Sequence, residues 1–132
     1  MTEAAYLLSK DAEVLLAPYV QLLLGEDHPP EISSPAFATP WDYRFGDLFL
    51  DLKLVPKALV FGQVADQTLK EIRSALQKGI FVVLFIPPRL YLLGPWDITW
   101  DGTLESLLTR PSVLLPKEVV QQVWELYDRM TS

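Results

Sequence analysis

The chain has 132 residues, 50% hydrophobic and 21% charged, which is the length and composition of one folded domain and not of a disordered chain. Its 17 acidic and 11 basic residues give a net charge of −6, which disfavours non-specific binding to a nucleic-acid backbone. The absence of cysteine excludes disulfides, thiolate metal sites and a cysteine nucleophile.

The start of the chain and its apolar runs bear on localisation. The first residues lack the basic and small-residue pattern of a signal peptide, and no apolar run approaches the roughly 18 residues of a membrane span. We therefore expect a cytoplasmic protein. The chain has no asparagine and 11 prolines, which indicates a thermophile as its source.

Residues 1–40 are predicted to form a helical segment followed by a loop. Apolar residues recur near helical spacing over residues 2–24, which predicts one or two helices, kinked or divided at Pro18. A short buried strand over residues 14–18 is the alternative. The prolines at positions 29, 30, 35 and 40 then predict a long loop over residues 25–40.

Residues 41–132 are predicted to form the α/β core of the same single domain. Thr39 and Pro40 have the pattern of a helix N-cap followed by proline at the first helical position. Apolar residues at helical spacing predict a helix that ends before Pro56. The alternation of apolar and charged residues over 50–54 favours a strand instead, and both readings stay open.

Residues 58–86 carry the clearest pattern. A short apolar strand is predicted over 58–61, a helix over 67–78 that Gly79 ends, and a second strand over 80–86. Two nearly continuous apolar strands around a helix predict a parallel βαβ crossover. The fold class expected from it is a three-layer flavodoxin- or Rossmann-like α/β domain with a small, mostly parallel sheet.

The pattern loosens after the second strand. Turn residues around an aromatic stretch predict an excursion or hairpin over residues 89–101. A short helix over 103–109, a strand over 112–115 and a final helix over 116–130 follow.

The loop from Gly62 to Asp66 is the first candidate binding site. It lies where a predicted strand leads into a helix, and ligands of parallel sheets collect at such carboxyl ends. Free amides and the helix dipole would favour an anionic substrate there. Asp66 is also an ordinary N-cap residue, so a purely structural role is the alternative.

Thr68, Glu71 and Gly79, with the strand that follows, carry a family pattern. Over residues 58–86 the chain resembles the nucleoside 2-deoxyribosyltransferase-like superfamily. This resemblance implies a nucleoside- or nucleotide-processing N-glycosidic transferase or hydrolase that completes its site by forming a homo-oligomer. Gln67 departs from the family, which commonly has glycine at that position.

The resemblance also implies roles for individual residues. Glu71 matches the nucleophile that attacks the anomeric carbon, and Gly62, Asp66 and Thr68 would contact the substrate. Asp47 and Asp51, four residues apart on the predicted helix, or Asp42, could supply the proton donor or bind a sugar hydroxyl.

A non-catalytic protein-binding regulator on the same scaffold is the competing prediction. An acidic, apolar-rich chain of this size could be a phage-encoded factor that docks on host RNA polymerase and modulates transcription. Its contact surface would include Trp96, Asp97 and Trp100. No cofactor is expected, and His28, the only histidine, predicts no metal centre.

Overall fold

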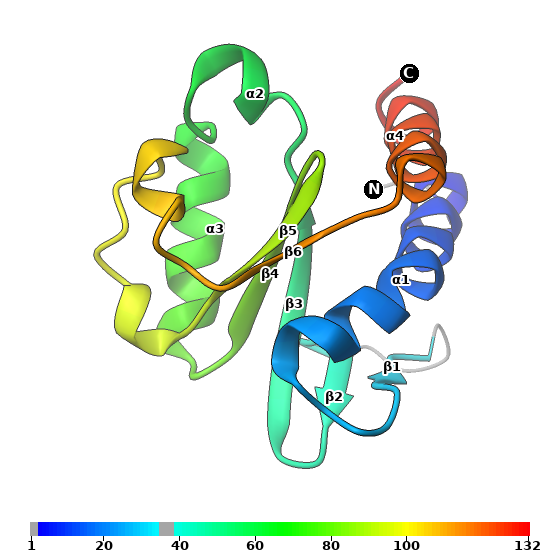
Figure 1. The fold of residues 1–132 in the computed structure, drawn as a ribbon, viewed down its shortest axis with the longest axis horizontal. Coiled ribbons are helices and arrows are strands. Elements are labelled where there is room, and N and C mark those ends of the chain that lie inside the picture. The colour runs from blue at the N-terminus through cyan, green and yellow to red at the C-terminus, as the bar shows by residue number, and fades with distance from the viewer. Residues whose placement is uncertain (1–2, 35–38) are drawn as a thin grey trace.

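The structure is a computed structural model that describes residues 3–34 and 39–132 (Figure 1). Thr2, predicted to be helical, and Pro35, predicted to lie in a loop, fall outside the described residues. In chain order the elements are α1 (Glu3–Leu24), β1 (Glu31–Ile32), β2 (Tyr43–Phe45), β3 (Leu48–Leu54), α2 (Ala58–Phe61), α3 (Asp66–Gln77), β4 (Phe81–Ile86), β5 (Arg89–Leu93), the 3-10 helices η1 (Pro95–Asp97) and η2 (Glu105–Leu107), β6 (Ser112–Leu114) and α4 (Lys117–Thr131).

The described strands form one six-stranded mixed sheet in the order β1-β2-β3-β4-β5-β6. Only β3 and β4 pair in parallel, and the other neighbours pair antiparallel. The general α/β prediction is confirmed, but the expectation of a mostly parallel sheet is wrong. Tight hairpins join β2 to β3 and β4 to β5, and only the α2–α3 segment crosses over between parallel strands.

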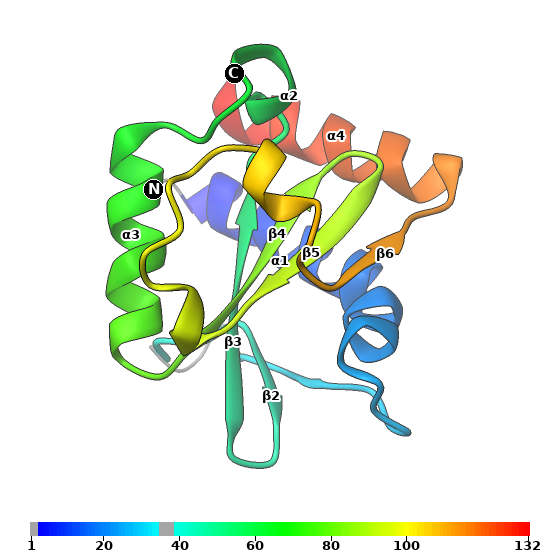
Figure 2. The same cartoon turned by 60° about the vertical axis from the view of Figure 1, so that its left-hand side comes forward.

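Helices lie against both faces of the sheet (Figures 1 and 2). Helices α1 and α4 pack on one face, where Leu16, Leu50, Phe85 and Val123 form a buried cluster. Helix α3 and the two 3-10 helices cover the other face. Within the described residues, no helix is long and apolar enough to cross a membrane.

Helix α1 runs unbroken through Pro18. Its buried face includes Ala12, Leu16 and Val20, all fully shielded from water, and Pro18 is exposed on the side away from the sheet. Packing of this apolar stripe outweighs the hydrogen bond that proline removes. The alternative of a strand over residues 14–18 is therefore wrong.

The predicted helix over residues 41–55 is also wrong, because this segment forms the β2–β3 hairpin. Gly46 makes the turn with a positive φ of 59°, which glycine adopts without strain. Along β3, leucines at the even positions face α1 and α4, and Phe49, Asp51 and Lys53 face the other way. The alternative strand over residues 50–54 is confirmed as part of β3.

The predicted strand over residues 58–61 is instead the short helix α2, which Gly62 ends in a left-handed conformation with φ of 72°. The parallel crossover exists, but its first strand is β3. The predicted helix and second strand of the unit correspond to α3 and β4. Burial explains the error, since the apolar side chains of α2 are largely exposed and not part of the sheet.

The predictions for residues 89–130 agree more closely with the structure. The predicted excursion after β4 contains a hairpin, in which β5 pairs with β4. The short helix predicted over 103–109 is reduced to the single 3-10 turn η2. The final strand and helix are confirmed as β6 and α4.

Candidate functional site

The C-terminal half of β3 extends past the end of β2, its partner in the hairpin. Strand β2 pairs only with residues 48–50 of β3, so residues 51–54 extend past it. Asp42, just before β2, fills the start of this gap. Its amide donates to the Leu50 carbonyl over 2.8 Å, and its Oδ2 accepts from the Leu52 amide over 2.7 Å. The hairpin thereby brings the carboxyl groups of Asp42 and Asp51 side by side.

Asp51 is the most perturbed acid of this group. Burial raises its pKa to about 7, and the hydrogen bond and negative charge of Asp42 add to the effect, while Lys53 opposes it. Near neutral pH Asp51 is therefore only partly ionised.

Lys53 lies between two carboxylates. Its Nζ is 3.5 Å from Asp51 Oδ2 and 3.4 Å from Glu71 Oε2 on α3. Burial lowers the pKa of Lys53, but the charges of Asp51 and Glu71 outweigh it and the net shift is upward. The lysine is therefore a fixed positive charge beside the aspartate pair, and Glu71 is its solvent-exposed partner.

Glu13 reaches the same region from α1. Its side chain is buried and pairs with Lys10 over 2.9 Å, and Lys10 also donates to Ser33. Burial raises the pKa of Glu13 against the opposing effect of Lys10, and the charge of Asp51 raises it further. Tyr43 fixes this part of α1 by donating from its hydroxyl to the Glu13 carbonyl over 2.6 Å.

A cavity of about 310 Å³ opens between α1, β3 and α4. Its polar lining residues are Tyr6, Ser9, Lys10, Glu13, Asp42, Asp51, Lys53 and Tyr127. A second depression of about 450 Å³ on the α3 side shares Asp51 and includes Glu71. Asp51 thus lies between two openings, one on each side of the β3 edge. We call the four residues Glu13, Asp42, Asp51 and Lys53 the edge cluster.

The residues predicted to form a catalytic site separate into two groups. Asp51 and Glu71 converge on Lys53. Asp47 lies in the exposed turn before β3, roughly 13 Å along the strand from Asp51, because the segment is extended and not helical.

The residues predicted to bind substrate lie after the C-terminal end of β3, at the opposite end of the strand from Asp47. Gly62 ends α2, and Asp66 is in the first turn of α3. Thr68 lines a third cavity of about 370 Å³ between α2, α3 and α4. Neither Gly62 nor Asp66 lines that cavity or the edge cluster.

The sequence patterns did not identify Glu13 or Lys53, and they treated Asp42 only as an alternative proton donor. The available signal was the alternation Asp51-Leu52-Lys53, which in a strand places both charged side chains on one face. Lys10 and Glu13, three residues apart, share one face of α1 in the same way.

The aromatic stretch predicted to bind a partner is mostly internal. Trp100 is 3% exposed, and its indole N–H donates to the Ser106 hydroxyl over 2.7 Å. Asp97 is buried and forms an ion pair with Arg110 over 2.7 Å. A partner on this surface would meet Trp96, which is 73% exposed, but neither of the other two.

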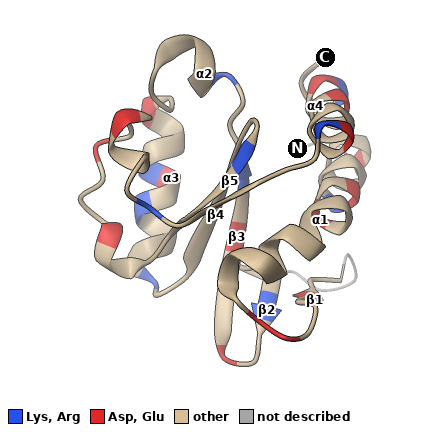
Figure 3. Ribbon diagram, in the orientation of Figure 1, with Lys and Arg blue, Asp and Glu red and all other residues tan. Residues whose placement is uncertain are grey.

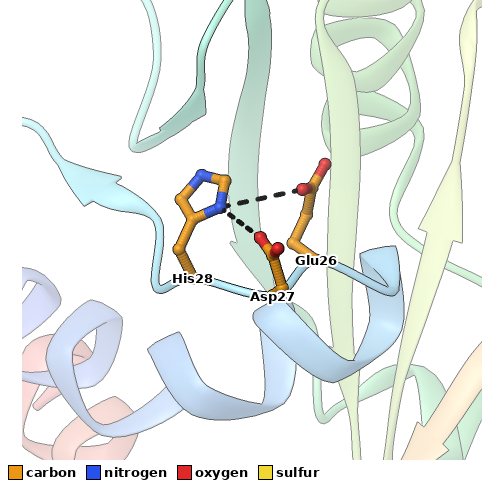
Figure 4. Close-up of side chains that lie close together, drawn as sticks. All are labelled: Glu26, Asp27 and His28. Atoms are coloured by element: carbon orange, nitrogen blue, oxygen red, sulfur yellow. Dashed lines mark hydrogen bonds and ion pairs between the residues drawn. The ribbon is translucent and has the colours of Figure 1, made fainter.

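Glu26, Asp27 and His28 bring three ligand atoms within 4.8 Å of one another (Figure 4). His28 Nδ1 lies 3.0 Å from Asp27 Oδ1 and 4.0 Å from Glu26 Oε2. The His28 contact lowers the pKa of Asp27. The Asp27 side chain is 98% exposed, and exposed acids beside a histidine commonly hold no ion, so the contacts within this turn account for the group.

Comparison of the chain with protein-family models, with curated proteins and with solved structures finds no match. The chemistry of the edge cluster is therefore the basis for assigning a function.

Proposed function

We propose that the chain is a phosphodiester hydrolase that uses a divalent cation held by Asp42 and Asp51 and that acts on nucleic acid. The observation that carries this proposal is the pairing of two carboxyl groups beside a protonated lysine in an open cavity. Hard cations such as Mg²⁺ bind proteins through one or two carboxylates and complete their shell with water and substrate phosphate.

The donor set fits such a cation. The charge of Asp42 contributes to the high pKa of Asp51, so a dication held by these two residues would displace the proton of Asp51 and relieve the repulsion between them. Asp42 is held by the Leu52 amide through one oxygen, which leaves its second oxygen for a ligand. Glu13, on the far wall of the same cavity, is placed to accept hydrogen bonds from metal-bound water.

The roles of the protein groups follow from their charges. A divalent cation at such a site would polarise the phosphoryl group and make its bound water more acidic. Lys53, held protonated by its two carboxylate neighbours, would stabilise the negative charge that grows on the phosphoryl oxygens. Water adds to phosphorus and releases a proton to solvent, the bond to the leaving oxygen breaks, and that oxygen takes up a proton from solvent.

The local charge differs from the net charge of −6. Basic side chains line the openings on both sides of β3, and Figure 3 shows basic positions beside α2 and along α3. The lysines in these openings are Lys10, Lys53, Lys57, Lys70 and Lys78. The same openings also hold four acidic side chains, those of Glu13, Asp42, Asp51 and Glu71, so the local charge is close to neutral and would repel a phosphate chain less than the protein as a whole does.

The direct test is cleavage of end-labelled DNA and RNA oligonucleotides with Mg²⁺ or Mn²⁺ and with a chelator. We expect cleavage with metal and none with the chelator. Asp51→Asn and Lys53→Ala should each reduce the rate by at least about a hundredfold. Asp47→Asn is the matched control and should leave the rate unchanged. Metal-independent cleavage, or cleavage that survives both substitutions, would contradict the proposal.

A second candidate is the N-glycosidic reaction implied by the resemblance to the 2-deoxyribosyltransferase-like superfamily, with the Rossmann-like arrangement that it entails. Its support is the position of Glu71 and Asp51. Because each lies near 3.5 Å from Lys53 Nζ, their oxygens are at most about 7 Å apart, which allows the separation of roughly 5–5.5 Å found between the two carboxyl groups of retaining glycosidases. Asp51, with its raised pKa, would be the acid and Glu71 the nucleophile.

Release of a free base from nucleosides or nucleotides tests this second candidate. It requires no metal, and Glu71→Ala should abolish it. The phosphodiesterase proposal instead expects Glu71→Ala to retain most of its cleavage activity, because Glu71 only pairs with Lys53. The same variant therefore separates the two reactions.

The regulator alternative has one supporting observation, the exposed Trp96 ring packed edge-on against Phe81 at 5.3 Å between centroids. Recovery of RNA polymerase from host lysate with the native chain but not with Trp96→Ala would support it. Equal recovery by both chains would count against this surface.

A further inference from the structure

Helix α2 carries unusually exposed apolar side chains. Val60 is 79% exposed, Phe61 73% and Leu59 46%, in three consecutive positions of one helical turn. Figures 1 and 2 place α2 at the same end of the sheet as the C-terminal part of α4. Of the three, Phe61 lines the cavity next to Thr68, and Leu59 and Val60 do not line that cavity.

This cavity of about 370 Å³ is within the size range of small-ligand sites and has their composition. Apolar groups from the end of β3, from α2 and from the segment just before α3 form most of its wall, with Phe61 and Tyr127 as its aromatic members. The polar members are Lys57, Gln63 and Thr68. We call it the α2 cavity.

The α2 cavity adjoins the cavity of the edge cluster. Leu54 and Tyr127 line both the α2 cavity and the cavity that contains Asp42 and Asp51. Leu54 follows Asp51 by three residues along β3, a rise of roughly 10 Å. A polynucleotide with one phosphate at Asp51 would therefore have a neighbouring nucleotide within reach of the α2 cavity.

We propose that the α2 cavity binds an unpaired nucleobase and that the preferred substrate of the edge cluster is single-stranded nucleic acid. This inference rests on the proposed phosphodiesterase function. Phe61 would stack on the base, and Gln63 and Thr68 would bond to its polar edge. Exposed Lys57 would contact an adjoining phosphate. A base inside a duplex is stacked and paired, so entry into a side pocket would require it to leave the helix.

The test measures binding without cleavage. Asp51→Asn is used in metal-free buffer, with fluorescence anisotropy of a labelled single strand and of a hairpin duplex of the same composition. We expect the single strand to bind at least tenfold more tightly. Adding Phe61→Ala should weaken single-strand binding roughly tenfold, because the base would lose the aromatic ring on which it stacks.

Val60→Ala is the matched control, because Val60 is as exposed as Phe61 but does not line the α2 cavity. It should leave binding unchanged. A strand containing 2-aminopurine provides a second readout, with fluorescence quenched on binding to the parent and restored by Phe61→Ala. Both substitutions are at exposed positions, so circular dichroism should show unchanged folding.

The inference is overturned if the duplex binds as tightly as the single strand, if no oligonucleotide binds, or if Phe61→Ala and Val60→Ala behave alike. In the last case an apolar segment of a protein partner becomes the better occupant of α2. Failure here is distinct from failure of the proposed function, because metal-dependent cleavage by the native chain is scored separately.

Discussion

Strands β3 and β4 are parallel neighbours, but they differ in their side chains: β4 is entirely apolar, whereas β3 carries charged residues. β4 has the sequence FVVLFI, and all of its residues except the first are buried. β3, paired with it in register, has Asp51 opposite Val82 and Lys53 opposite Leu84. Strand β4 can be entirely apolar because helices cover both of its faces, whereas the C-terminal half of β3 borders open cavities. Stability and chemistry are thus divided between adjacent strands.

The largest expected effect is a loss of stability caused by a substitution in β4. Leu84→Ala removes a fully buried side chain and should lower the free energy of unfolding by about 2–5 kcal/mol. Chemical denaturation measures it. A loss below about 1 kcal/mol would mean that β4 is not the centre of the packed core.

A substitution at Asp51 in β3 should have the opposite effect, with a loss of activity but no loss of stability. Asp51→Asn should reduce metal-dependent cleavage by at least about a hundredfold while leaving the fold as stable as before or more stable, because it removes one member of a repelling carboxylate pair. Parallel denaturation and cleavage assays measure the two effects. A destabilisation as large as that of Leu84→Ala would show that Asp51 is a structural residue.

The pH dependence of stability sharpens the same contrast. The pKa of Asp51 in the folded chain, about 7, lies above its ordinary value of 3.8, so its favourable contribution is present at low pH and is lost as pH rises towards and through 7. We expect this group to lower stability by about 1–3 kcal/mol between pH 4 and 8, after allowance for its contact with water. Asp51→Asn should flatten the profile, and an unchanged profile would contradict the raised pKa.

Added Mg²⁺ should raise the melting temperature more at pH 8 than at pH 5, because the proton that Asp51 carries at pH 5 competes with the cation. Differential scanning calorimetry measures the difference. A shift of equal size at both values, or one that persists in Asp51→Asn, would place the cation elsewhere, with the Glu26, Asp27 and His28 group as the next candidate.

The smallest expected effect is that of Asp47→Asn, which should change stability by less than about 0.5 kcal/mol and leave cleavage unaltered. Asp47 is exposed in the β2–β3 turn. A marked loss of activity would show that the β2–β3 turn, with Asp47, is part of the active site.

The sequence was sufficient where one periodicity dominated. The apolar stripe of α3 and the continuous run of β4 allowed only one reading each, and both were correct within a residue or two. Over residues 41–55, Phe45, Leu48 and Leu52 fit helical spacing while the even-numbered leucines fit a strand. Tertiary packing against α1 decided between them, and a local pattern does not contain that information.

The same ambiguity explains what was missed in the site. On a helix Asp51 groups with Asp47, whereas in the hairpin it groups with Asp42 and Lys53. Glu13 is brought to the site by long-range packing of α1 on the sheet, which no spacing rule predicts. Asp51 and Glu71 were predicted together from the sequence and both lie beside Lys53, which was not predicted.

The bond between Asp42 and the Leu52 amide has a consequence for solubility. Where β2 stops, β3 would otherwise present its backbone donors to any extended chain nearby, as exposed sheet edges do in aggregation. One carboxylate oxygen occupies the first of these donors and places negative charge beside it. The residue proposed to hold a cation thus also protects the sheet against the addition of a foreign strand.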